Sequence, residues 1–244
     1  MPAILDDVLS SLTHDAPVRD LLVAAHWTVV CSHHVGMAST LMPVGPHGHS
    51  RVREAGRLHL KTARQLADLA LSAELTEASI GVAAMNSLLE MDPAAAQDIN
   101  AADVLLSRGR DRNVALIGHF RFIPELRDAA RQLWVIELEP AQDEYPAESA
   151  DALLPKADVV AITSTTLANH TLDGLLALCK PKATVMLLGP STPLSPILFD
   201  HGVNILSGTR VIDESAVLRT VSQGASFPQV EGVQLLTFVR EKES

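Results

Sequence analysis

Residues 158–188 read DVVAITSTTLANHTLDGLLALCKPKATVMLL, and this stretch decides the fold. Two short apolar runs, Asp158–Thr163 and Thr184–Leu188, flank a segment with helical spacing, Thr171–Cys179. Strands that are apolar along their whole length are typical of parallel sheets, because helices bury both faces of such sheets. The stretch therefore predicts a strand–helix–strand unit with parallel strands.

The same alternation extends toward the N-terminus of this stretch. Strands are expected at Val114–Ile117 and Leu133–Leu138, and helices at Glu125–Arg131 and Glu148–Leu154. Such alternation predicts a Rossmann-like domain with a mainly parallel sheet. In open sheets of this kind ligands bind at the carboxyl ends of the strands, so the residues that follow the strands are the candidates for function.

The first part of the chain has a different pattern. Three β-prone runs, Leu21–Ala25, Thr28–Ser32 and Gly36–Leu41, predict an antiparallel meander. Helical spacing follows at Leu60–Leu71 and at Thr76–Glu90, where Thr76 is a plausible N-cap. The pattern changes at the charged stretch 107–112, so we expect an α+β domain over residues 1–110 and the Rossmann-like domain over 111–244.

Composition excludes several classes of protein. Of 244 residues, 47% are hydrophobic and 20% are charged, which is typical of a globular chain with a substantial core. The net charge of −10 opposes nucleic-acid binding. No apolar run reaches the roughly 20 residues of a membrane span, and Asp6 and Asp7 near the start favour an amphipathic helix over a signal peptide. With only two cysteines, no disulfide framework is expected. We therefore expect a cytoplasmic protein that binds neither nucleic acid nor membrane.

The predicted strand ends carry polar residues suited to a small ligand. Gly118 follows the first strand of the Rossmann-like domain, but Phe120 and Phe122 replace the further glycines of a dinucleotide site, which disfavours NAD or FAD. Glu137 lies about 20 residues later, where Rossmann-like proteins place an acid that binds ribose hydroxyls; a solvated loop acid is the alternative.

Two further strand ends carry hydroxyls and free N–H groups before a helix, namely 163–166 and 189–191. Helix N-termini attract anions, so these loops predict a small anionic ligand, although simple N-capping explains each loop alone.

Histidines are concentrated in the first quarter of the chain, which holds seven of the ten. His47 and His49 form an HxH motif in a Gly/Pro-rich loop. Neutral imidazoles bind Zn²⁺ or Ni²⁺ well, but a site needs three or four donors. A divalent metal at His47 and His49 is therefore one expectation, and solvated loop histidines are the other.

Several of these motifs together resemble the putative heavy-metal-chelation family. They are Gly118-His119-Phe120, Glu137-Leu138-Glu139-Pro140, TSTTLANHTL at 163–172 and LGPSTPL at 188–194, with GVAAMNSLL at 81–89 in the first half. The resemblance implies a domain similar to the N-terminal domain of enolase followed by a Rossmann-like domain, with a ligand site where the two meet.

The resemblance also implies which residues bind the ligand: Gly118, Glu137, Thr163, Thr165, Asn169, Gly189, Pro190, Ser191 and, from the first domain, Asn86. Ser164 stands where the family pattern leads us to expect glycine, and we expect its side chain beside the ligand.

Three functions remain open at this stage. The first is an enzyme for condensation, hydrolysis or group transfer on a small anionic, metal-chelating molecule, with His119 or His170 as acid or base. The second is a non-catalytic protein that binds a heavy metal or a metal complex. The third is a scaffold whose apolar surface serves homo-oligomerisation. No nucleophile with an adjacent base is visible in the sequence, so catalysis is left open.

Overall fold

The computed structural model describes residues 3–43, 51–92, 96 and 99–240. Its N-terminal sheet is a three-stranded antiparallel meander in the order β1-β2-β3. The strands are β1 (Asp20–Val23), β2 (Trp27–Cys31) and β3 (Val35–Ser39). The predicted meander is confirmed, with each strand within a few residues of its expected place.

The C-terminal sheet has seven strands in the order β10-β9-β8-β7-β4-β5-β6, and all neighbours are parallel except β9 and β10. The strands are β4 (Asn113–Ile117), β5 (Gln132–Glu137), β6 (Tyr145–Pro146), β7 (Val159–Thr163), β8 (Thr184–Leu188), β9 (Ile205–Val211) and β10 (Val233–Val239). The predicted α/β fold is confirmed. The chain order reverses between β4 and β7, which makes their carboxyl ends the topological switch point of the sheet.

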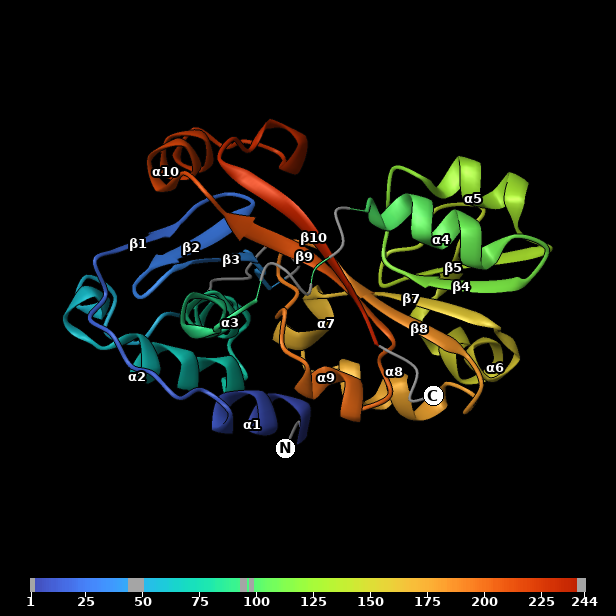
Figure 1. Cartoon of the computed structure of the whole chain (residues 1–244), viewed down its shortest axis with the longest axis horizontal. Coiled ribbons are helices and arrows are strands. Elements are labelled where there is room, and N and C mark those ends of the chain that lie inside the picture. The colour runs from blue at the N-terminus through green and yellow to red at the C-terminus, as the bar shows by residue number, and fades with distance from the viewer. Residues whose placement is uncertain (1–2, 44–50, 93–95, 97–98, 241–244) are drawn as a thin grey trace.

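Helices cover both faces of the C-terminal sheet (Figure 1). Side chains alternate across each strand, so Val159 and Ala161 pack toward α4 and α5, whereas Val160 and Ile162 pack toward the opposite layer. The helices of this part of the chain are α4 (Ala101–Gly109), α5 (Ile123–Ala129), α6 (Ala150–Leu153), α7 (Thr165–Ala168), α8 (Leu172–Leu178), α9 (Ile197–Asp200) and α10 (Glu214–Ser222), of which α10 packs on the N-terminal sheet instead. Burial on both faces explains why the strands are apolar throughout.

The remaining helices belong to the N-terminal part: α1 (Ala3–Ser10), α2 (Ala63–Ala67) and α3 (Leu75–Leu88). Helix α3 lies against one face of the N-terminal sheet, with β2 and β3 as its strand contacts. The expected N-cap at Thr76 is wrong: Glu74 precedes the helix, and the buried hydroxyl of Thr76 donates to the carbonyl oxygen of Leu41 at 2.8 Å. A tertiary contact has taken the place of the cap.

The two sheets are joined by the last part of the chain. Helix α10 packs on the face of the N-terminal sheet opposite α3 (Figure 1), where Val217 and Val221 meet Val29, Cys31 and Met37. The indole N–H of Trp27 donates to the carbonyl oxygen of Ala225 at 3.0 Å. Helix α4, which precedes residue 110, packs against α5 and β7. The division at 110/111 stays a prediction.

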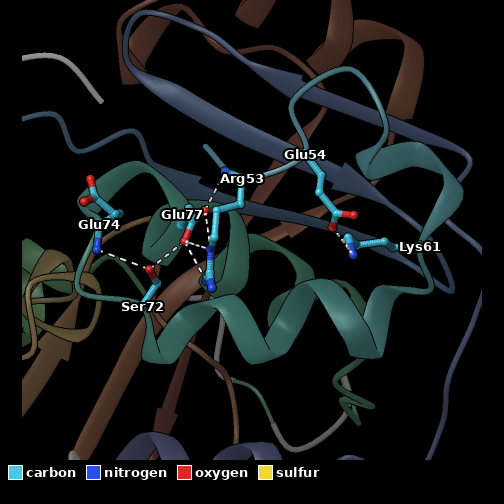
Figure 2. Close-up of polar contacts among 6 residues, drawn as sticks. All are labelled: Arg53, Glu54, Lys61, Ser72, Glu74 and Glu77. Atoms are coloured by element: carbon cyan, nitrogen blue, oxygen red, sulfur yellow. Dashed lines mark hydrogen bonds and ion pairs between the residues drawn. The ribbon is translucent and has the colours of Figure 1, made fainter. Parts of the chain in front are cut away.

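An ion pair between the exposed Arg53 and the buried Glu77 fixes the segment that enters the N-terminal helices (Figure 2). Glu77 of α3 is fully buried and accepts from the backbone N–H of Arg53, from its guanidinium and from the hydroxyl of Ser72. Burial raises the pKa of Glu77, but these hydrogen bonds outweigh it and lower the pKa to about 2. The carboxylate is therefore ionised inside the fold.

Within the described residues, no helix is long and apolar enough to cross a bilayer.

Candidate functional site

A cavity of about 450 Å³ lies at the switch point of the C-terminal sheet. It is lined where β4, β5 and β7 end and along α6 and α8. Six of the residues expected to bind ligand or to act as acid or base line it: Gly118, Glu137, Thr163, Thr165, Asn169 and His170. The volume is within the usual range for small-molecule sites, so the cavity is the candidate functional site.

The tight turn after β4 brings two of these residues together. Gly118 has φ +108°, and a Cβ there would lie 2.9 Å from the Cβ of Thr163. Its N–H donates to the carbonyl oxygen of Ile136 at 3.1 Å. Only glycine combines this conformation with so close an approach, and the strand ends of β4 and β7 can therefore form one wall of the cavity.

The threonines after β7 form a compact hydrogen-bonded group. The hydroxyls of Thr163 and Thr165 lie 3.1 Å apart, and the hydroxyl of Thr166 donates to the carbonyl oxygen of Thr163 at 2.6 Å. The side-chain oxygen of Asn169 accepts from the backbone N–H and the hydroxyl of Thr171. This wall offers hydroxyl groups in fixed positions.

Glu137 is the half-buried acid of the cavity. Burial raises its pKa above the usual glutamate range, and a 3.3 Å hydrogen bond from the N–H of Leu138 partly offsets this. The nearby carboxylate of Glu144 raises the pKa further. A carboxyl with a raised pKa is protonated at higher pH than usual, and in that form it donates as well as accepts.

The two candidate acid–base histidines lie in different surroundings. His170 lines the cavity with φ +61°, and its Nε2 donates to the carbonyl oxygen of Ala70 at 2.7 Å. This bond places a proton on Nε2 and ties the cavity wall to the N-terminal part. His119 does not line the cavity: its side chain is 67% exposed, and its Nδ1 lies 2.8 Å from Oε1 of Glu144.

The loop after β8 lies elsewhere. Gly189, Pro190 and Ser191 are absent from the cavity lining, because this loop docks on the N-terminal sheet. The hydroxyl of Ser191 accepts from the N–H of Ser39 at 2.8 Å, and the carbonyl oxygen of Ser191 accepts from the side chain of Asn86 at 3.1 Å. Ser191 and Asn86 thus hold the two parts of the chain together.

Three further expectations differ from the structure or lie outside it. All the residues that line the cavity fall between Ile117 and Leu178, so within the described residues this cavity is not the interdomain site that we expected, which stays a prediction. Ser164 is also absent from the lining; its Oγ would lie 2.8 Å from a Cβ at Gly189, so it packs against the β8 loop. His47 and His49 lie outside the described residues.

Sequence reasoning missed the helical wall of the cavity. Ala150 and Asp151 come from α6, and Gly174, Leu175 and Leu178 come from α8. Both helices were expected, but spacing alone does not say which turn of a helix faces a strand end. The sequence did contain one relevant pattern: the apolar face of α8 predicts that this helix packs against the sheet.

The described part of the chain offers this cavity no set of metal ligands. No three His, Cys, Asp or Glu side chains of the cavity have ligating atoms close enough to share an ion. Nε2 of His170 is already engaged with Ala70. A directly coordinated Zn²⁺ or Ni²⁺ does not fit these residues.

Comparisons with known proteins agree with this architecture. Two family models, both described as "Putative heavy-metal chelation", match residues 5–89 and 100–240. An uncharacterized protein of Methanocaldococcus jannaschii is 27% identical over 225 residues, covering 87% of this chain and 85% of its own.

Two crystal structures of proteins with unknown function from the DUF364 family are also similar. The protein from Desulfitobacterium hafniense superposes with a TM-score of 0.82 at 26% identity, covering 97% of this chain and 98% of its own. The protein from Pyrococcus horikoshii gives 0.83 at 21% identity, covering 98% and 99%, and this likeness concerns the fold.

Proposed function

This chain belongs to the family described as "Putative heavy-metal chelation", and we propose that it binds a small organic molecule in the cavity at the switch point of the C-terminal sheet. The observation that carries the proposal is the convergence of Gly118, Glu137, Thr163, Thr165 and Asn169 on one cavity of about 450 Å³. Ligands of open α/β sheets bind at this place for a general reason: loops from strands on both sides diverge there and leave a crevice.

The charges around the cavity indicate the class of ligand. Of the residues that the structure describes, two acids, Glu137 and Asp151, line it, and no lysine or arginine does. A free anion would be repelled by these carboxylates. The lining therefore favours a neutral or amine-bearing ligand. It favours an anion only when a chelated cation balances the charge, so we replace the simple anionic ligand expected from the sequence by these classes.

The polar groups suggest how such a molecule would be held. An amine or hydroxyl of the ligand would donate to Glu137, while acceptor atoms would meet the hydroxyls of Thr163 and Thr165. The apolar remainder would lie against Leu175 and Leu178 of α8. We propose binding rather than a reaction, because the hydroxyls of the cavity bond to each other, to a backbone carbonyl oxygen and to the amide oxygen of Asn169 rather than to a general base.

Ligand-observed NMR with a fragment library of amines, neutral heterocycles and carboxylates would test this proposal. We expect amines and neutral heterocycles to bind, and amines to lose at least about tenfold in affinity in Glu137→Gln, because a charge-assisted hydrogen bond is lost. Glu148→Gln removes an exposed carboxylate that does not line the cavity and should change nothing. Preferential binding of carboxylates, or equal amine binding in both variants, would contradict the proposal.

A further inference from the structure

A second group of ligating side chains lies far from this cavity, on the N-terminal sheet. We propose that His33, His34 and Glu90 form a surface site for one borderline divalent cation, Zn²⁺ or Ni²⁺. In residues 3–43, 51–92, 96 and 99–240, these three side chains are the one group of His, Cys, Asp and Glu whose ligating atoms all lie within 4.8 Å of one another. The site is independent of the small-molecule cavity and of the function proposed for it.

The distances suit a cation. Nε2 of His33 lies 2.7 Å from Oε1 of Glu90, and Nε2 of His34 lies 3.6 Å from Oε2 of the same carboxylate. Ligands at about 2.0–2.1 Å around a tetrahedral zinc ion are roughly 3.3 Å apart, so small rotations of three exposed side chains would bring them to ligand spacing. Two imidazoles and one carboxylate are a donor set that zinc and nickel accept.

The backbone that carries these side chains is rigidly held. His33 and His34 form the turn between β2 and β3, and the N–H of His34 donates to the carbonyl oxygen of Ser87 at 2.9 Å. Below the turn, the buried hydroxyls of Ser32 and Ser87 lie 2.6 Å apart. The turn is therefore fastened to the end of α3, three residues before Glu90.

Close packing of β3 on α3 strengthens this fixation. A Cβ at Gly36 would lie 2.0 Å from the carbonyl oxygen of Ala83, so the strand lies nearer the helix than any other residue type allows. Because both elements are fixed, the turn that carries the two histidines already lies beside the end of α3, two residues before Glu90. Preorganised ligands bind a metal more tightly than ligands that must first be ordered.

A fourth imidazole lies beside the group. The ring of His14 stacks on that of His33, with centroids 5.6 Å apart and planes at 5°, and its Nδ1 lies 3.9 Å from Oε1 of Glu90. Three protein ligands leave one position of a tetrahedral ion for water or for a small co-ligand. His33 and His34 also border a cavity of about 280 Å³ between the two parts of the chain, which leaves room for such a co-ligand.

Isothermal titration of the full chain with ZnSO₄ and NiCl₂ would test the site. We expect one ion per chain. The affinity for this ion should fall at least about a hundredfold in His33→Ala/His34→Ala and at least about tenfold in Glu90→Gln, because each change removes atoms that bind the metal. His26→Ala is the matched control, since His26 is an exposed histidine in the other turn of the same sheet. The control and His47→Ala/His49→Ala should bind as the parent does.

A second measurement keeps the test valid if the double variant does not fold, which its circular dichroism would reveal. The X-ray absorption fine structure of the zinc-loaded parent should contain two or three imidazoles and a carboxylate. The proposal is overturned if the parent binds neither metal up to about 1 mM, if the folded double variant binds as well as the parent, if affinity is lost only in His47→Ala/His49→Ala, or if the zinc shell lacks a pair of imidazoles.

Discussion

Replacing Glu77 by glutamine would test whether its buried carboxylate stabilises the fold as its contacts indicate. The pKa of Glu77 is lowered from 4.5 to about 2 in the folded protein. At about 1.4 kcal/mol per pKa unit, the ionised carboxylate contributes about 3 kcal/mol at pH 7. Glutamine keeps the shape but loses the charge that receives Arg53 and Ser72 (Figure 2), so Glu77→Gln should destabilise the protein by about 3 kcal/mol at pH 7.

The dependence of this loss on pH is the more specific part of the prediction. Because the folded pKa lies below the unfolded one, the contribution is complete well above pH 4.5 and falls as pH falls toward 2. Urea unfolding of parent and variant at pH 7 and pH 3.5 should therefore show the difference in unfolding free energy decreasing by roughly 1 kcal/mol at the lower pH. Glu74→Gln is the control, because Glu74 is exposed and lies immediately before α3. A difference that does not change with pH would refute the reasoning.

Two further substitutions test how the strand-end loops are held. Gly118→Ala should cost about 1–3 kcal/mol of unfolding free energy, because φ is +108° and the added Cβ would meet Thr163; a thermal melt no lower than that of the parent would contradict this. Ser191→Ala should cost about 1–2 kcal/mol, since the N–H of Ser39 loses its acceptor. The hydrogen-exchange rate of the Ser39 amide should then rise. Unchanged protection of this amide would contradict a stabilising role for the hydrogen bond between Ser39 and Ser191.

The sequence was sufficient to predict the N-terminal meander, four adjacent strands of the C-terminal sheet (β8, β7, β4 and β5) and several residues of the cavity, but not β6, β9 or β10. Apolar runs such as Val159–Thr163 and Thr184–Leu188 reflect burial on two faces, a property of each strand by itself. The switch-point rule then located Gly118, Glu137 and Thr163 at one edge, because strand order and parallel direction are enough to place strand ends.

What the sequence could not predict depends on contacts between distant segments. The loops at Gly189–Ser191 and Thr163–Thr166 both follow a strand and carry hydroxyl groups, yet Ser191 meets Ser39, 152 residues away in the chain. Similarly, no local pattern brings Glu90 to His33, since α3 separates them. Such pairs are decided by how whole elements pack, which periodicity within one element does not encode.

The position of α10 has a consequence for biosynthesis. Among the described residues, the face of the N-terminal sheet formed by Val29, Cys31 and Met37 is covered by Val217, Val221 and their neighbours, almost 200 residues later in the chain. A ribosome releases the sheet long before it releases α10, so the nascent chain carries an open apolar surface until α10 has been made. Such surfaces favour aggregation until the missing element arrives. Native packing of the N-terminal sheet is therefore completed only after α10 has been synthesised and has docked.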